Sequence, residues 1–177
     1  MGNTQQQLLD AVEIDRILKR MVCEILEVHK ETRNLSLIGI HTRGVFLARR
    51  LRQHIKTFEG VEVPTGEIDI TLYRDDWTQL TAQPVVKTTD IPFSVEGKQI
   101  VLVDDVLFTG RTIRAALDAI MDFGRPARIE LAVLVDRGHR ELPIQSNYTG
   151  HTVDTRRTQM INVMLKESDG EDRVVLE

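Results

Sequence analysis

The sequence predicts an α/β fold with a mostly parallel central sheet flanked by helices. First, strand-like and helix-like segments alternate along the chain, as they do when crossover helices connect parallel strands. Second, three mainly apolar runs are typical of strands buried on both faces: Leu35–Ile40, Ile100–Val103 and Ile129–Val135. Third, each run ends in a polar cluster, and such sheets bind their ligands beyond the carboxyl ends of the strands.

Length and composition fit one globular domain over residues 1–177. The chain is 41% hydrophobic and 28% charged, which is ordinary for a domain with a real core. Its one cysteine, Cys23, cannot form an intrachain disulfide, which favours a reducing, cytoplasmic location. No apolar run approaches the roughly 20 residues of a membrane span, and the polar N-terminus is no signal peptide.

The first predicted element is an amphipathic helix that begins after Asp10 and ends near Lys30. Asp10 and Glu13 have the spacing of a capping box. The apolar residues that follow recur at helical spacing and form one face: Ile14, Ile17, Leu18, Met21, Val22, Ile25 and Leu26. We expect this face to dock on the sheet.

The strand Leu35–Ile40 runs into His41, Thr42, Arg43 and Gly44. An arginine offers a fork of donors and a glycine permits close backbone approach, which together suit a pyrophosphate. An ordinary strand-to-helix turn is the alternative for so short a string. The next helix carries four basic residues, which form either a solvated face or part of an RNA-binding surface: Arg49, Arg50, Arg52 and Lys56.

The segment from 71 to 90 is interpreted as a flexible β-hairpin with a long polar tip. Glu67–Tyr73 alternates like a strand, and the chain becomes strand-like again at Val85–Lys87. Arg74, at the base of this hairpin, is a candidate phosphate contact. The alternative for Arg74 is an ion pair with Asp75 or Asp76.

The most informative stretch is Ile100–Thr112, where a buried strand meets the adjacent carboxylates Asp104 and Asp105. The small residues after them, Thr109, Gly110 and Thr112, let backbone N–H groups form a cradle for a phosphate. Acids beside an anion cradle suit a ligand that carries a phosphate and hydroxyls, as ribose 5-phosphate does. Alternatively, the acids only cap a turn.

The rest of the chain continues the alternation. A helical stripe runs from Ile113 to Phe123, and the strand Ile129–Val135 ends in another polar cluster: Asp136, Arg137, Gly138, His139 and Arg140. Ile161–Leu165 is a short strand, Ser168–Gly170 a turn and Arg173–Leu176 a last strand. The sequence shows no Ser-His-Asp or Cys-His arrangement, and His29 and His54 are interpreted as surface histidines.

The stretch Ile100–Thr112 resembles the 5-phosphoribosyl-1-pyrophosphate (PRPP) signature of type I phosphoribosyltransferases. Two further strings, Glu67–Asp76 and Leu131–Ile144, resemble the PyrR family, bacterial proteins that regulate the pyrimidine operon and act as uracil phosphoribosyltransferases. The similarity runs from about Ala11 to the C-terminal end. It implies the type I phosphoribosyltransferase fold, with a core at about 30–137, a small hood from the N-terminal helix and about 138–177, and the flexible hairpin at about 71–90.

The resemblance also implies roles for individual residues. Asp104 and Asp105 would be catalytic, and the 5′-phosphate would bind to Val106, Leu107, Phe108, Thr109, Gly110, Arg111 and Thr112. Pyrophosphate would bind to Thr42, Arg43 and Gly44, and the base and nucleotide to Asp136, Arg137 and Ile161. Mg²⁺ would be held mainly by the ligand, with Asp104, Asp105 or Asp136 acting directly or through water.

The implied function is twofold: conversion of uracil and PRPP to UMP, and control of an mRNA leader by an RNA-binding regulator that senses UMP, UTP or PRPP. The RNA contacts would come from Lys19, Arg20, His139, Arg140 and Arg157. The net charge of −4 gives RNA binding no general support. Family members often carry basic residues or histidine where Gln145, His151 and Cys23 stand, and proline where Asp154 stands.

Two alternatives remain open. One is a sensor of PRPP or nucleotide that has lost catalysis, and the other is a phosphoribosyltransferase for a different base, such as a purine or orotate. The resemblance further implies a homodimer or larger homo-oligomer, and neither DNA nor a membrane is an expected partner.

Overall fold

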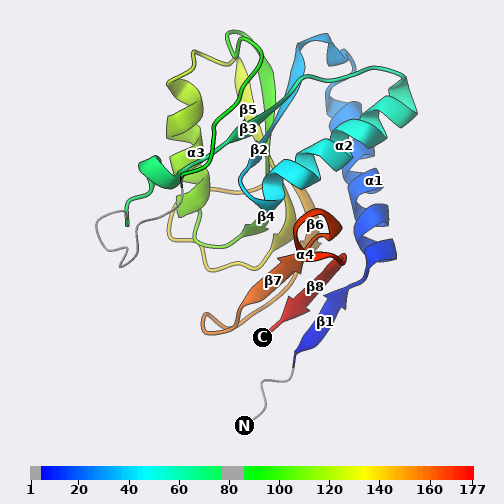
Figure 1. Cartoon of the computed structure of the whole chain (residues 1–177), viewed down its shortest axis with the longest axis vertical. Coiled ribbons are helices and arrows are strands. Elements are labelled where there is room, and N and C mark those ends of the chain that lie inside the picture. Colours follow the sequence, from blue (N-terminus) through cyan, green and yellow to red (C-terminus); the bar gives the residue numbers. More distant parts are fainter. Residues whose placement is uncertain (1–4, 77–85) are drawn as a thin grey trace.

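A computed structural model describes residues 5–76 and 86–177. Its centre is a five-stranded sheet in the order β3-β2-β4-β5-β6, with every neighbouring pair parallel (Figure 1). The strands are β2 (Leu35–Ile40), β3 (Thr65–Ile68), β4 (Gln99–Leu107), β5 (Arg128–Asp136) and β6 (Tyr148–Thr152). The predicted α/β class with a parallel sheet is confirmed.

Helices cover both faces of this sheet. Helices α1 (Ala11–Val28) and α2 (Arg43–Glu59) pack on one face, and α3 (Arg111–Met121) packs on the other (Figure 1). The two faces have separate cores because successive strand residues point in opposite directions: Val101 and Val103 join the α1–α2 core, whereas Ile100 and Leu102 join the α3 core. The described part of the chain has no helix long and apolar enough to cross a membrane.

The start of α1 confirms the predicted capping box. The Asp10 carboxylate accepts a hydrogen bond from the Glu13 N–H at 2.8 Å, and the Glu13 carboxylate accepts one from the Asp10 N–H at 2.8 Å. The apolar face of α1 is buried against the central sheet, with Ile14, Leu18 and Ile25 almost fully enclosed.

Gly44 has a packing role at the start of α2. A Cβ atom built on Gly44 would lie 2.4 Å from the Val103 carbonyl oxygen, which no side chain tolerates. The glycine therefore lets α2 begin directly on β4, and its expected contact with a ligand stays a prediction. This contact fixes the distance between the α2 N-terminus and the Asp104–Asp105 pair.

A second sheet forms the hood. It is antiparallel in the order β1-β8-β7 and joins β1 (Gln6–Leu9) to β7 (Ile161–Met164) and β8 (Arg173–Leu176). The short helix α4 (Lys166–Asp169) connects β7 to β8, and the hood lies beside the carboxyl edge of the central sheet (Figure 1). Helix α1 and strand β6 pack with the central sheet, whereas the resemblance had assigned both to the hood.

The expected strand Glu67–Tyr73 was wrong beyond Ile68. The Asp69 carboxylate accepts hydrogen bonds from the Thr71 N–H and hydroxyl, at 2.9 and 2.5 Å, and so turns the chain into a short 3₁₀ helix at Thr71–Tyr73. A single antiparallel bridge joins Glu67 to Asp90 and closes this segment. The proposed tip of the hairpin, residues 77–85, lies outside the described residues.

His29 is buried, which corrects its interpretation as a surface histidine. It follows α1 and reaches the amino ends of β4 and β5, where its Nδ1 lies 2.6 Å from Gln99 Oε1 and its Nε2 contacts Glu130. Arg128 also pairs with Glu130, and the Tyr148 hydroxyl donates to it at 3.1 Å. The amino edge of the sheet thus holds a buried polar cluster whose groups have partners.

Candidate functional site

A cavity of about 310 Å³ lies at the carboxyl ends of β2 and β4. It collects side chains from four separate segments of the sequence, namely the loop before α2, the turn after β3, the end of β4 and the start of α3. Its polar lining includes His41, Thr42, Arg43, Asp69, Thr71, Arg74, Asp104, Asp105 and Thr112. The structure therefore brings together Thr42 and Arg43, expected for pyrophosphate, the acids expected for ribose, and two of the residues expected for the 5′-phosphate, Val106 and Thr112.

Asp104 and Asp105 are held by neighbouring backbone groups. An Asp104 oxygen accepts from the Asp105 N–H at 2.9 Å, and an Asp105 oxygen accepts from the Val106 N–H at 2.8 Å. Strand β4 continues through both acids to Leu107, beyond the predicted end at Val103. This continuation fixes the acids on a rigid element.

The two carboxylates have no cation partner among the described residues. Asp104 is only 6% exposed, and burial raises its pKa well above the ordinary value, with the charge of Asp105 acting in the same direction. Burial also raises the pKa of Asp105, although the Val106 N–H and the charge of Arg43 oppose this shift. These acids therefore retain hydrogen-bonding capacity for a ligand.

The loop after β4 has the geometry of an anion cradle. Gly110 adopts a left-handed conformation with φ of +90° immediately before α3, and the Thr109 hydroxyl accepts from the Arg111 N–H at 3.3 Å. Beside this helix N-terminus lies a cavity of about 240 Å³, lined by Arg74, Asp75, Asp76, Phe108, Thr109, Arg111 and Thr112. Backbone N–H groups at such a helix start favour a phosphate.

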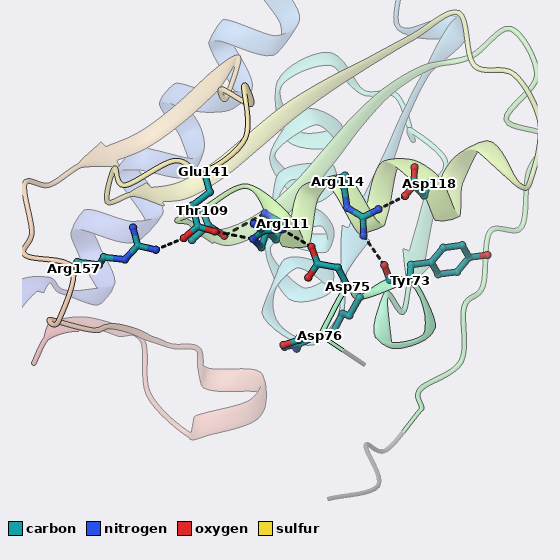
Figure 2. Close-up of polar contacts among 10 residues, drawn as sticks. Tyr73, Asp75, Asp76, Thr109, Arg111, Arg114, Asp118, Glu141 and Arg157 are labelled. Atoms are coloured by element: carbon teal, nitrogen blue, oxygen red, sulfur yellow. Dashed lines mark hydrogen bonds and ion pairs between the residues drawn. The ribbon is translucent and has the colours of Figure 1, made fainter. Parts of the chain in front are cut away.

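Arg111 joins three parts of the chain in this region (Figure 2). Its guanidinium donates to Glu141 at 2.7 Å and to Asp75 at 2.6 Å, while the other oxygen of Glu141 contacts Arg157. The arginines 111 and 157 lower the pKa of Glu141. The loop expected to bind the 5′-phosphate, here called the phosphate loop, is therefore tied to the turn after β3 and to the β5–β6 connection.

One turn further along α3, Arg114 makes a similar but separate connection. It donates to the Tyr73 carbonyl at 2.9 Å and pairs with Asp118 at 2.7 Å (Figure 2).

The loop expected to bind pyrophosphate begins with a cis peptide bond between His41 and Thr42. The Thr42 hydroxyl accepts a hydrogen bond from Lys87, which was not among the predicted site residues. Arg43 donates through Nε and Nη2 to the two oxygens of Asp169, at 3.2 and 2.9 Å. Neither partner is foreseeable from local sequence, because each lies more than 40 residues away.

Arg74 forms an ion pair with Asp76, which was the alternative to a phosphate contact. It donates to both oxygens of Asp76, at 2.8 and 2.6 Å. Its side chain nevertheless lines both the acid-pair cavity and the phosphate-loop cavity. Arg74 thus lies where a phosphate contact would be made.

Asp136, expected at the nucleotide, and Arg140, expected at RNA, form an ion pair with each other. Arg140 pairs with Asp136 and donates to the carbonyls of Phe108 and Ile144, at 3.0 and 2.9 Å. Asp136 also accepts from the Gly138 N–H at 2.9 Å, and it is absent from the lining of the acid-pair cavity. The pair fastens the β5–β6 connection to the loop after β4, and RNA contact by Arg140 stays a prediction.

Arg137 and Ile161 lie on different sides of the site. Arg137 is 6% exposed, its guanidinium carbon lies 4.0 Å from the centre of the Phe108 ring, and burial lowers its pKa. It donates to the Arg156 carbonyl at 3.1 Å. Ile161 instead lines a hood cavity of about 290 Å³ together with Arg43 and Asp105.

The residues expected to contact RNA form two groups. Lys19 and Arg20 lie on α1, where they pair with Asp15 and Glu24, and Arg20 also donates to the Thr149 carbonyl of β6. His139 and Arg157 lie around Phe108 instead: His139 contacts the Thr155 carbonyl at 2.7 Å, and Arg157 pairs with Glu141.

Comparisons with known proteins agree with this geometry. Residues 4–165 match the family model described as a phosphoribosyl transferase domain. Solved structures give the fold: a hypoxanthine phosphoribosyl transferase of Trypanosoma cruzi has a TM-score of 0.74 at 20% identity, covering 97% of this chain and 89% of its own. One from Staphylococcus aureus has a TM-score of 0.71 at 17% identity, with 96% and 90% covered.

Sequence relatives have much higher identity to this chain, and the three that follow are named "Bifunctional protein PyrR". The protein of Pelotomaculum thermopropionicum is 58% identical over 99% of this chain and 97% of its own length. The protein of Thermus thermophilus is 58% identical over 96% and 94%, and that of Elusimicrobium minutum 55% identical over 97% and 96%. The chain belongs to the PyrR family, within the phosphoribosyltransferases of the type I fold.

Proposed function

We propose that this protein transfers the ribosyl 5-phosphate group of PRPP to uracil, forming UMP and diphosphate. The observation that carries the proposal is the arrangement around the acid pair. Asp104 and Asp105 lie on a rigid strand between an anion cradle at Thr109–Thr112 and a second loop that presents Arg43. A ligand with a phosphate at one end, a ribose in the middle and a diphosphate at the other matches this order.

In this reaction the bond from ribose C1 to the diphosphate oxygen breaks, and the electron pair leaves with the diphosphate. A bond from uracil N1 to C1 forms, and the N1 proton passes to solvent. Asp104 and Asp105 accept hydrogen bonds from the ribose hydroxyls and stabilise the positive charge that develops at C1. The Arg43 guanidinium stabilises the negative charge that gathers on the leaving group.

The donor set fits a hydrated Mg²⁺ bound together with PRPP. The described residues contain no cluster of three or more His, Cys, Asp or Glu side chains arranged to hold a metal alone. The buried Asp104 and the half-buried Asp105, neither with a cation partner among the described residues, face the cavity, and Mg²⁺ prefers oxygen ligands while keeping several waters. Asp104 and Asp105 would hold it with ligand oxygens, and when bound it would neutralise diphosphate charge.

Strand β7 supplies groups that can select uracil. Met160 and Glu177 exchange backbone hydrogen bonds of 2.8 and 2.9 Å, so the antiparallel alternation turns the N–H and C=O groups of Ile161 and Val163 away from β8. Both residues line the hood cavity, and β7 is the outer strand of its sheet. A backbone donor and acceptor there match the carbonyl and N3–H of uracil, whereas cytosine offers the opposite pattern.

The test is a product assay with Mg²⁺, PRPP and one base at a time: uracil, cytosine, hypoxanthine, guanine or orotate. We expect UMP from uracil alone. A product from another base in preference to uracil would contradict the base assignment. Measurable binding of PRPP without any product would establish the alternative, a sensor without catalysis.

We also propose that the protein binds an mRNA leader and that uridine nucleotides in the same site control this binding. The relatives' name, "Bifunctional protein PyrR", supports a second activity. Arg157 supports a link between RNA binding and the nucleotide site. Its side chain is 60% exposed, and it is connected to Arg111 of the phosphate loop through Glu141. Reciprocal linkage then requires that RNA change the affinity for UMP by the same factor as UMP changes the affinity for RNA.

This second activity is tested with a leader transcript of the pyrimidine genes and a scrambled transcript of equal length. We expect the leader to bind more tightly, and UMP or UTP to change its affinity. Equal affinity for both transcripts would contradict a regulatory role. Sedimentation of the same samples tests the expected homodimer or larger homo-oligomer.

A further inference from the structure

We propose that Asp169 is a positioning residue that holds the Arg43 guanidinium in place for the diphosphate leaving group. The inference rests on the proposed function and adds a residue of the hood to the site. Asp169 and Arg43 are 126 positions apart in the sequence, and the docking of α4 on the start of α2 brings them together.

The Arg43–Asp169 contact uses one edge of the guanidinium. Arg43 Nε lies 3.2 Å from one Asp169 oxygen, and Nη2 lies 2.9 Å from the other. A fork of this kind fixes the plane of the guanidinium as well as its position. Within residues 5–76 and 86–177, Nη1 of Arg43 makes no hydrogen bond, so this donor is left for a ligand.

Arg43 lies at the junction of two cavities. It lines the acid-pair cavity with Asp104 and Thr112, and it lines the hood cavity with Ile161; Asp105 lines both. The leaving group of PRPP departs from the same carbon that the base attacks. A cation fixed between the ribose acids and the base cavity is therefore well placed to act on that leaving group.

Asp169 is itself held rigidly. The oxygen that accepts from Arg43 Nε also accepts from the Leu165 N–H at 2.8 Å and from the Ser168 hydroxyl at 2.7 Å. These donors and Arg43 lower the pKa of Asp169 to about 2, so the carboxylate stays charged at neutral pH. A charged acid that is itself held by the Leu165 N–H and the Ser168 hydroxyl restricts the arginine more than an acid without such partners would.

The same helix offers a matched control. Arg50, two turns further along α2, also pairs with acids of the hood, at 2.6 Å from Glu167 and 2.7 Å from Asp172. Arg50 is absent from the lining of the acid-pair and hood cavities. The ion pairs of Arg50 hold the hood on α2 without facing either cavity. The Arg43–Asp169 pair also holds the hood on α2, but Arg43 faces both cavities.

The experiment compares Asp169→Asn with Asp172→Asn and with Asp169→Glu. Each Asn variant removes one negative charge and weakens one ion pair between α2 and the hood. We expect Asp169→Asn to lower kcat for UMP formation about 10-fold, because a displaced catalytic group costs rate even when it remains present. Inhibition by diphosphate should weaken by a similar factor. UMP affinity should not change, because UMP carries no diphosphate.

Asp172→Asn should leave kcat and diphosphate inhibition near wild type, and Asp169→Glu should recover part of the lost kcat. Equal losses in Asp169→Asn and Asp172→Asn would show that the acids only dock the hood, and would overturn the proposal. A fall in UMP affinity with Asp169→Asn would overturn it as well. If the wild-type protein makes no UMP, the proposed function fails, and diphosphate affinity measured by calorimetry still tests Asp169.

Discussion

Two buried carboxylates on neighbouring strands show opposite arrangements. Glu130 of β5 is 3% exposed and is contacted by the His29 ring, the Arg128 guanidinium and the Tyr148 hydroxyl. Asp104 of β4 is almost as buried, but among the described residues it has a backbone N–H, a neighbouring acid and no cation.

The difference separates stability from function. A buried charge is costly unless other groups of the protein satisfy it, and Glu130 meets that condition within the fold. Asp104 does not, so burying its carboxylate costs some of the free energy of folding. We expect a bound ligand to supply the missing hydrogen-bond partners. Acids with a raised pKa in a cavity are typical of functional sites for this reason.

The largest expected effect is on catalysis. Replacing both acids of the site, Asp104→Asn with Asp105→Asn, should lower UMP formation by about 10²- to 10³-fold, because it removes the charges that face the developing cation. The measurement is steady-state kinetics at saturating uracil. Glu130→Gln is the control, and a comparable loss of kcat in that folded variant would break the distinction between the two acids.

The next effect is on stability. His29→Ala removes the imidazole from the buried Glu130 carboxylate, which keeps the Tyr148 hydroxyl and Arg128, and should reduce the free energy of unfolding by about 3–5 kcal/mol. Urea titration followed by circular dichroism gives this value. A loss below about 1 kcal/mol would mean that water or Arg128 replaces the imidazole at little cost.

Asp104 has a smaller effect on the free energy of unfolding, and of opposite sign: its buried carboxylate destabilises the folded state at neutral pH. The pKa of Asp104 is raised in the folded state above its ordinary 3.8, so the unfolded chain releases this proton first. The free energy of unfolding therefore falls as pH rises from about 3.8 through the raised pKa.

Asp104→Asn removes this contribution and should stabilise the protein at neutral pH by about 0.5–2 kcal/mol, as substitutions that relieve functional sites commonly do. Urea titrations of the variant and the wild-type protein at several pH values test both the gain and its pH dependence. A variant less stable than wild type at pH 7 would show that the Asp104 carboxylate supports the fold.

The smallest effect is expected at an exposed pair. Arg33 and Glu31 are each 81% exposed at a distance of 3.4 Å, so Arg33→Ala should change the free energy of unfolding by less than about 0.5 kcal/mol. The same urea titration provides a baseline for the buried pair. A change above about 1 kcal/mol would show that ion pairs cannot be ranked here by burial.

Patterns within a short window were enough to predict most of the central fold. The capping box, the helical stripes and the apolar runs each depend on neighbouring residues, and the structure confirms them. That the loops after β2 and β4 line one cavity was also predictable, because strand ends of a parallel sheet share one edge.

Features that depend on distant partners were missed. His29 looked like a surface histidine because Glu130 lies 101 positions away. Lys87 and Asp169 reach the pyrophosphate loop across 45 and 126 positions. The strands β1 (QQLL) and β6 (YTGHT) were also missed, because both have fewer apolar residues than the similarly short β7 and β8, which were predicted.

The pairing of β1 with β8 also bears on how the protein folds. Gln6 faces Leu176, so this contact closes a loop of about 170 residues, whereas neighbouring strands of the central sheet pair over much shorter separations. Loop closure over such a distance is slow, and we expect the central sheet to form before the hood. During synthesis on the ribosome, β1 emerges long before its partner. The hood cavity is therefore completed last. A nucleotide that contacts the hood binds only fully folded molecules and stabilises them by mass action.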